Sequence, residues 1–176
     1  PHWWRDTKKT GGLAFTMLGS HTVDLTLWIY EGKKPIRVYA EARSKKPEFE
    51  GMDEITMVIS FEDGAIATNH LSLNTSPEKF GGFILGPKGS IEINHYRTDM
   101  LGIFSGTLLI NGKSVPVDEQ DSNNISRQMR EFAESILQKR QPMVKNHEIL
   151  MQLAIIDAAK KSAETLQPVA LNDPLY

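Results

Sequence analysis

A histidine inside a predicted helix is the strongest candidate for chemistry in this chain. Residues 10–32, TGGLAFTMLGSHTVDLTLWIYEG, run from a pair of glycines into a helical pattern that carries His21. At helical spacing one stripe of this pattern contains Met17, His21, Leu25 and Trp28. The pattern predicts a proton-transfer group that lies within an apolar, buried face.

Asp24 follows His21 by one helical turn and lies beside the stripe. Burial disfavours the charged imidazolium and a neighbouring carboxylate favours it, so Asp24 would hold the ring in one tautomer and keep its basicity near neutral pH. The same spacing also fits a hydrogen-bonded structural pair with no catalytic role. The residues alone leave both interpretations open.

Length and composition predict one globular domain. The 176 residues are 40% hydrophobic and 24% charged, which is enough for a single sizeable core. A formal net charge of -2 with interspersed signs does not suit nucleic acid, and no apolar stretch has the length of a membrane span. The absence of cysteine excludes disulfides and thiolate chemistry, and no histidine has a second ligand at short metal spacing, so we expect no metal site.

After Gly32 the pattern changes from helical to alternating. Residues 36–42 predict a strand with Ile36, Val38, Ala40 and Ala42 on its buried face. Hairpins are predicted over residues 54–73, 80–96 and 108–117, with turns at Asp63-Gly64, Pro87-Lys88-Gly89 and Asn111-Gly112. Pro116 places the last of these strands at an edge. Six or more strands joined by short turns imply an open, mainly antiparallel sheet.

Two helices are predicted to close the chain. Ser122 to Asn124 offer caps for the first, whose apolar residues, Ile125, Met129, Phe132, Ile136 and Leu137, should lie on the sheet. Asn146 can cap the second, whose apolar face comprises Ile149, Leu150, Leu153, Ile156 and Ala163. The expected class is α+β, with helices on one face of the sheet. The hairpins place apolar residues on both sides, so the other face is either an interface between copies or a mixed surface.

Motifs along the chain also occur together, in the same order, in a known family. They are Trp3-Trp4-Arg5, Gly11-Gly12 with His21 and Asp24, the turn Gly86-Pro87-Lys88-Gly89-Ser90-Ile91, and a tail over residues 132–171 with FAESILQKRQP, IIDAAKKSAE and QPVAL. Together they resemble the C-terminal domain of the glucose-fructose oxidoreductase / inositol dehydrogenase / MocA family. The likeness covers nearly the whole chain.

The resemblance implies a dihydrodipicolinate-reductase-like C-terminal domain in a two-domain parent. The parent would carry an N-terminal dinucleotide-binding domain before Pro1, with NAD or NADP bound there. Residues 1–176 contain neither a GxGxxG fingerprint nor the family's Glu-Lys-Pro motif, so we expect a single substrate-binding and oligomerisation domain that binds no cofactor and is inactive alone. We expect a cytoplasmic homodimer or tetramer formed through the sheet face, although an export signal could have preceded Pro1.

The resemblance also assigns roles to residues of the predicted helix. It implies an acid-base role for His21, with Gly11, Gly12 and Asp24 as structural support. The family commonly has aspartate at the position of Met17, in the pattern Asp-x-Gly-x-His, and a thioether cannot transfer protons. The substitution implies a changed substrate, a histidine that acts without its usual partner, or a parent that has lost catalysis.

Trp4 and Arg5 are candidates for substrate binding together with Met17. With Trp3 they combine aromatic rings and a guanidinium, which suit the apolar face and hydroxyls of a sugar-like ligand. The same residues are equally suited to anchoring the start of the chain.

Two functions follow from these observations. In the first, the chain is the substrate-binding and assembly domain of an NAD(P)-dependent oxidoreductase that acts on a sugar, polyol or related hydroxyl compound, and His21 accepts a proton as hydride leaves the carbinol carbon. In the alternative, the chain is a ligand-binding or oligomerisation module in which Met17 marks the loss of the reaction.

Overall fold

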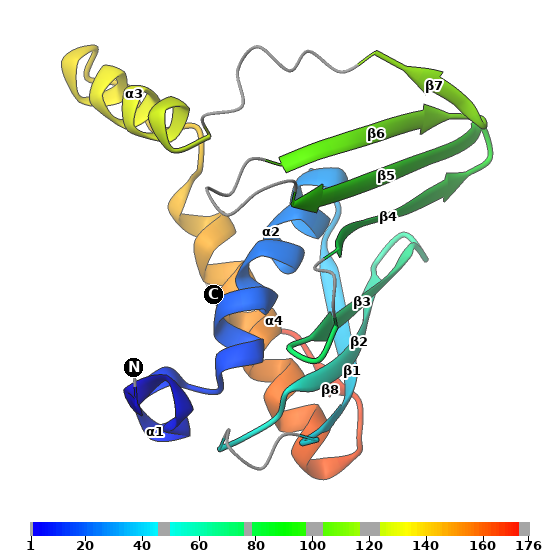
Figure 1. The fold of residues 1–176 in the computed structure, drawn as a ribbon, viewed down its shortest axis with the longest axis vertical. Helices are drawn as coiled ribbons and strands as arrows, with labels where there is room; N and C mark the ends of the chain where they lie inside the picture. Colours follow the sequence, from blue (N-terminus) through cyan, green and yellow to red (C-terminus); the bar gives the residue numbers. More distant parts are fainter. Residues whose placement is uncertain (1, 46–49, 76–78, 98–103, 117–123, 173–176) are drawn as a thin grey trace. The chain divides into compact units, whose positions relative to one another are not determined.

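The chain divides into two compact units, each with its own four-stranded antiparallel sheet (Figure 1). The computed structural model describes residues 2–45, 50–75, 79–97, 104–116 and 124–172. Unit 1 comprises Pro1–Asn74 and Met143–Tyr176, and unit 2 comprises Thr75–Pro142. The α+β class and the antiparallel pairing are confirmed, but the described strands form two sheets where one was expected. A single domain over residues 1–176 stays a prediction.

The sheet of unit 1 has the strand order β3-β2-β1-β8. Its strands are β1 (Pro35–Arg43), β2 (Glu54–Phe61), β3 (Ile66–Ser72) and β8 (Val169–Ala170). The predicted β2–β3 hairpin is confirmed, and Gly64 has the positive φ of 87° that its turn requires. Ile36 is exposed, contrary to the prediction, because the pairing register shifts between Pro35 and Arg37 and the inward alternation starts only after that bulge.

Helices of unit 1 cover one face of this sheet (Figure 1). Those that contact the sheet are η2 (Ala14–Leu18, a π-helix), α2 (Gly19–Ile29) and α4 (Asn146–Thr165). Before them in the chain come η1 (His2–Arg5, a 3₁₀-helix) and α1 (Thr7–Thr10). The predicted cap Asn146 is instead the first helical residue of α4, and Lys145 is the N-cap. The carboxylate of Glu148 accepts the backbone N–H of Lys145 at 2.7 Å, so one of the unpaired N–H groups at the helix start has a partner without an asparagine cap.

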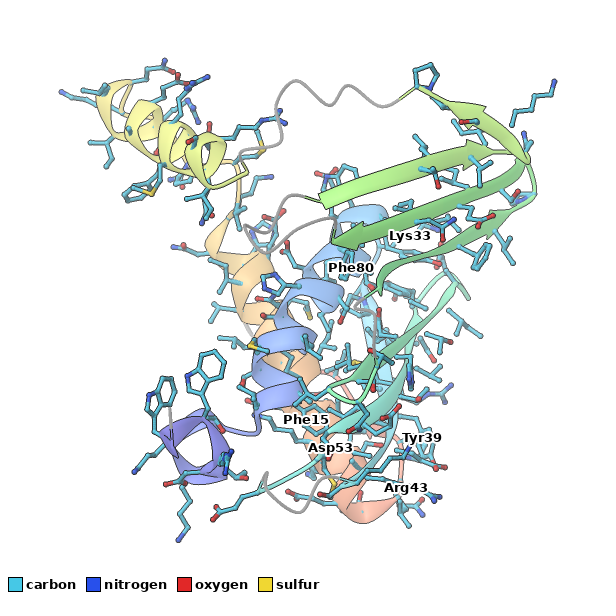
Figure 2. The ribbon with its side chains drawn as sticks, viewed as in Figure 1. Phe15, Lys33, Tyr39, Arg43, Asp53 and Phe80 are labelled. Atoms are coloured by element: carbon cyan, nitrogen blue, oxygen red, sulfur yellow. The ribbon has the colours of Figure 1, made fainter. Side chains whose placement is uncertain are left out.

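The core of unit 1 lies between these helices and the sheet. Its buried apolar residues are Ala14, Phe15 (labelled in Figure 2), Val23, Val38, Ala40, Ile55, Met57, Ile59, Phe61, Leu71, Ile155, Ile156, Ala158 and Ala159. On α4 the predicted face is partly wrong, because Ile149, Leu150 and Leu153 are exposed. The buried residues are Ile155, Ile156, Ala158, Ala159 and Ser162, of which only Ile156 was predicted. Small side chains let α4 approach β1 closely, and buried Ser162 accepts the Ala40 N–H at 2.9 Å.

The outer face of the unit 1 sheet is a mixed surface. Its side chains are Arg37, Tyr39, Glu41, Arg43, Glu54, Thr56, Val58, Ser60, Ile66, Thr68, His70 and Ser72, of which Tyr39 and Arg43 are labelled in Figure 2. Since side chains alternate along a strand, Ile55, Met57, Ile59 and Phe61 of β2 point to the helices, whereas Val58 lies on the outer face. The prediction of many apolar residues on both sides is therefore not met by this sheet, because Val58 and Ile66 lie among mostly polar residues on its outer face.

Unit 2 contains the strand order β4-β5-β6-β7 and one helix. The elements are β4 (Lys79–Gly86), β5 (Gly89–Arg97), β6 (Phe104–Ile110), β7 (Lys113–Val115) and α3 (Asn124–Leu137). Both predicted hairpins are confirmed, and Asn111 and Gly112, with φ of 53° and 76°, make the tight turn before β7. β7 is an edge strand and Pro116 follows it, as predicted.

No described apolar side chain of unit 2 is buried. On the strands, Phe83 and Leu85 are 70% and 78% exposed. On α3, the predicted apolar face is 55% to 81% exposed over Ile125, Met129, Phe132, Ile136 and Leu137. The prediction that this helix lies on the sheet is thus not met. An amphipathic pattern identifies the apolar face of a helix but not the surface against which that face packs. The predicted caps Ser122 and Asn123 lie outside the described residues.

Candidate active site

The glycine pair forms the turn between α1 and η2. Gly11 and Gly12 have φ of 68° and 87°, which only glycine adopts without strain. Gly11 ends α1 as a left-handed C-cap, and its N–H donates to Thr7 O at 2.8 Å. A Cβ built on Gly11 would lie 3.2 Å from Thr16 Cγ2, so the turn is also packed closely against the next helix. The glycines therefore set where that helix begins.

The π-helix η2 continues directly into α2. The Gly19 N–H donates to Ala14 O, five residues back, which is the bonding pattern of a π-turn. Thr16 closes the turn onto the glycines, because its hydroxyl lies 2.9 Å from Thr10 O and 3.1 Å from Gly12 O. Met17, the residue at the family's usual aspartate position, is half-buried within η2. Such π-turns occur often at functional sites.

His21 is exposed on α2, three residues after the last residue of the π-helix. The buried positions of α2 are Gly19, Val23 and Thr26. Within the predicted stripe, Trp28 is 71% exposed and Met17 and Leu25 are half-buried. The prediction that His21 lies in a buried apolar face is wrong. A glycine and a threonine do not stand out as core residues in a hydrophobic pattern, and the wider π-turn changes the angular position of the residues after it.

Asp24 is exposed beside His21. Within the described ranges, no hydrogen bond or ion pair joins the two side chains. The predicted supporting role of Asp24 stays a prediction.

Two residues outside the predicted set hold α2 in place. Gln152 of α4 donates its side-chain Nε2–H to the carbonyl oxygen of Ser20, the residue before His21. Thr26 donates to Thr22 O at 2.8 Å and lies 3.1 Å from the side-chain amide of Asn69 on β3. A hydroxyl has one proton, so the Asn69 NH₂ should face Thr26, which also gives that buried donor an acceptor. Neither partner is near α2 in sequence, so no local pattern could have found them.

Trp4 and Arg5 lie in the exposed 3₁₀-helix η1. The rings of Trp3 and Trp4 are edge to face with centroids 5.8 Å apart. The Arg5 carbonyl accepts the Glu50 N–H at 3.0 Å, which links this segment to the residues that precede β2. In the described part of the chain no hydrogen bond or ion pair links Trp4 or Arg5 to His21. Both the anchoring and the ligand-binding interpretation of these side chains stay predictions.

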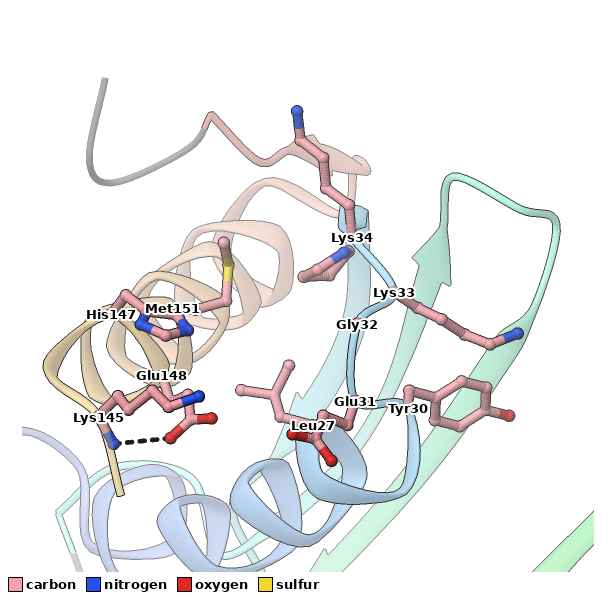
Figure 3. A pocket seen from close by; sticks show the side chains of 11 residues that line it. Leu27, Tyr30, Glu31, Gly32, Lys33, Lys34, Lys145, His147, Glu148 and Met151 are labelled. Atoms are coloured by element: carbon pink, nitrogen blue, oxygen red, sulfur yellow. Dashed lines mark hydrogen bonds between the residues drawn. The ribbon is translucent and has the colours of Figure 1, made fainter. Parts of the chain in front are cut away.

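A cavity of about 450 Å³ lies at the other end of α2 (Figure 3). Figure 3 shows His147 and Met151 of α4 on one side of it, and Leu27 of α2 with Tyr30, the residue after α2, on the other. His21 does not line this cavity. His21 is an exposed residue outside this cavity.

A polar network occupies the end of the β2–β3 hairpin. Asn74 donates to Glu54 Oε2 at 2.8 Å and is the main cause that lowers the pKa of Glu54. Burial acts against it, while a hydrogen bond from Ser72 and the charges of Lys45 and His70 lower the pKa further. His70 Nε2 lies 3.1 Å from Glu54 Oε1. This network was not predicted from the sequence.

The fold and the sequence place this chain among oxidoreductase domains. Residues 1–171 match the family described as "Oxidoreductase family, C-terminal alpha/beta domain". The chain belongs to this glucose-fructose oxidoreductase / inositol dehydrogenase / MocA family, and it is the family's C-terminal domain. The predicted family is therefore confirmed. No curated protein matches the sequence.

Solved structures share the fold. GenD2 from gentamicin A biosynthesis, in complex with NAD, matches with a TM-score of 0.78 at 21% identity over 98% of this chain and 52% of that one. The aldose-aldose oxidoreductase from Caulobacter crescentus, complexed with glycerol, matches with 0.78 at 25% identity, over 96% of this chain and 50% of that one. The WlbA dehydrogenase from Bordetella pertussis, in complex with NADH and UDP-GlcNAcA, matches with 0.70 at 20% identity, over 98% and 52%. This chain spans about half the length of each.

The described residues contain neither a membrane-spanning helix nor a metal-binding cluster. No helix there has the length and apolar character needed to cross a membrane. No three His, Cys, Asp or Glu side chains in the same ranges gather in a way that would hold a metal ion.

Proposed function

We propose that this chain is the substrate-binding and assembly domain of an NAD(P)-dependent oxidoreductase that acts on a sugar, polyol or related hydroxyl compound. The observation that carries the proposal is the exposed imidazole of His21 near the start of α2. The π-helix η2 leads directly into this helix, and Gln152 of α4 donates a hydrogen bond to the carbonyl of Ser20, the residue before His21. An imidazole in this place can accept the proton of a substrate hydroxyl as that carbon is oxidised.

The dinucleotide itself does not fit the described residues. Both sheets are antiparallel, so neither contains the βαβ unit whose first turn cradles a pyrophosphate. NAD or NADP, held by another domain of the parent, supplies the oxidant. The role of this chain is to orient the substrate and to hold a base beside it.

The proposed substrate class is supported by the ligands of the similar solved structures. The three structures above were solved with NAD, with glycerol and with NADH and UDP-GlcNAcA, which supports a hydroxyl-bearing substrate and a nicotinamide cofactor here. On this chain, Met17 lies one helical turn before His21, so we assign it to the substrate surface together with Trp4 and Arg5. Gly11, Gly12 and Asp24 support the site.

Assembly is the second part of the proposal. Large apolar residues of unit 2 are exposed on its sheet, at Phe83 and Leu85, and on α3, and exposed apolar surface of this kind is typical of protein interfaces. We assign this sheet face to contacts between copies, in a homodimer or tetramer.

One observation favours a second candidate. The thioether of Met17 stands where a carboxylate would share the proton transfer, which is expected of a ligand-binding or oligomerisation module that has lost the reaction.

Turnover by the full-length protein tests the proposal. Reduction of NAD⁺ and NADP⁺ is measured with a panel of sugars and polyols for wild type, His21→Ala and the control His147→Ala, which removes another exposed histidine. Loss of a general base should lower kcat of His21→Ala about 100-fold or more and leave the control unchanged. Equal turnover by His21→Ala would remove this histidine from the mechanism. A wild type that is silent on every substrate while it binds one would support the second candidate.

A further inference from the structure

The Ser20 carbonyl receives a hydrogen bond that its own helix does not need. A helical carbonyl has two lone pairs and uses one for the backbone N–H four residues on. Gln152 Nε2 of α4 donates to the Ser20 oxygen as well. Ser20 and Gln152 are both half-buried, so solvent competes little for this bond.

The bond lies at the junction where the direction of His21 is set. η2 ends at Leu18 and α2 begins at Gly19, with no side-chain cap between them. Gly19 has ordinary helical angles, φ −61° and ψ −37°, but no side chain that would restrict them. A small change in pitch at this point rotates every following residue, and His21 is the second of these.

α4 provides a rigid base for the bond. One turn after Gln152, Ile155 and Ile156 are 0% and 3% exposed in the core of unit 1. Position 152 is therefore held by the packing of α4 on the sheet. The hydrogen bond connects this packed helix to the residue that precedes His21.

We propose that Gln152 is a positioning residue: its amide fixes the junction of η2 and α2 and so the direction in which the His21 imidazole projects. The proposal deepens the proposed function and rests on it for its catalytic consequence. The orientation of the ring is a property of the chain itself, so the two claims can fail separately.

The test compares substitutions of nearly equal size. Gln152→Glu keeps the shape but replaces the donor with a carboxylate that the carbonyl repels, whereas Gln152→Lys can donate again. Gln128→Glu on exposed α3 makes the same charge change and serves as the control. Each is made in the full-length protein, with His21 assigned by His21→Ala in two-dimensional NMR of the histidine rings.

Gln152→Glu should shift the His21 ring resonances and lower kcat about tenfold with KM within about twofold, because the base is misaligned while binding is retained. Gln152→Lys should restore both, and Gln128→Glu should change neither. An unchanged His21 resonance in Gln152→Glu would overturn the positioning role. Equal effects of Gln152→Glu and Gln152→Lys would overturn it as well, because they indicate a general structural disturbance.

The positioning role of Gln152 and the catalytic role of His21 give different results in these experiments. A shifted His21 resonance without any change in turnover keeps the geometric link and contradicts the catalytic role of His21. Turnover that depends on His21 but not on Gln152 leaves the proposed function intact and overturns this inference.

Discussion

The two units build the same kind of sheet and differ in what covers it. Unit 1 has every buried apolar residue of the described chain, and unit 2 has none. The strands of unit 2 are no less apolar, since β4 contains Phe83, Ile84 and Leu85 in a row. The difference comes from α2 and α4, which cover one face of the first sheet.

This contrast assigns different tasks to the units. A sheet with a helical layer folds around its own core, and it can hold a helix such as α2 at a fixed place with His21 on its outer side. A sheet without such a layer must bury its apolar residues against another surface. In our account unit 1 supplies the chemistry and unit 2 supplies the contact between copies.

The largest expected difference between the two sheets is in the loss of unfolding free energy when an isoleucine of each is replaced by alanine. Ile59 on β2 is 0% exposed and Ile110 on β6 is 42% exposed. Ile59→Ala should lower the free energy of unfolding by about 3 kcal/mol, because it leaves a cavity in a closed core. Ile110→Ala should lower it by less than about 1 kcal/mol in a monomeric sample, since the side chain is partly solvated already. Chemical denaturation of the full chain measures both.

Equal losses of unfolding free energy in Ile59→Ala and Ile110→Ala would contradict the difference between the two units. They would mean that unit 2 has a closed core within one copy of the chain.

Acid should weaken unit 1 through Glu54, with a smaller effect. Its pKa is lowered from the ordinary 4.5, chiefly by the hydrogen bond from Asn74, so the folded state prefers the carboxylate. The stability that this adds is fully present above pH 4.5 and is lost as the pH falls through the lowered value. Between pH 7 and this acid range, wild type should lose about 1 kcal/mol more than Glu54→Gln.

Glu31→Gln is the control for this effect, because Glu31 is exposed at the end of α2. Its acid dependence should equal that of wild type. A Glu54→Gln variant that loses stability with acid as steeply as wild type would show that the network does not depend on this charge.

The sequence was sufficient to predict elements whose conformation depends on neighbouring residues. The Asp63-Gly64 and Asn111-Gly112 turns fix their hairpins through a few backbone angles, so these elements were predicted correctly. The resemblance of the motifs gave the family, and the match over residues 1–171 confirmed it.

The sequence was insufficient to predict burial and contacts that depend on segments far apart in the chain. Hydrophobic spacing predicted that His21 is buried, because a pattern cannot show that Gly19 and Thr26 face the sheet. The contact of Gln152 with Ser20 spans 132 residues and leaves no local signature. The split into two sheets was missed for the same reason, since alternation identifies strands but not which of them pair.

Hydrogen–deuterium exchange as a function of protein concentration tests the division between the units most directly. Protection reports local opening, so in dilute solution the amides of β2 should exchange at least about 100-fold more slowly than those of β5. Raising the concentration should slow exchange in β4, β5 and β6 and leave β2 unchanged, because association covers the second sheet alone. Equal protection of β2 and β5 at every concentration would contradict the account.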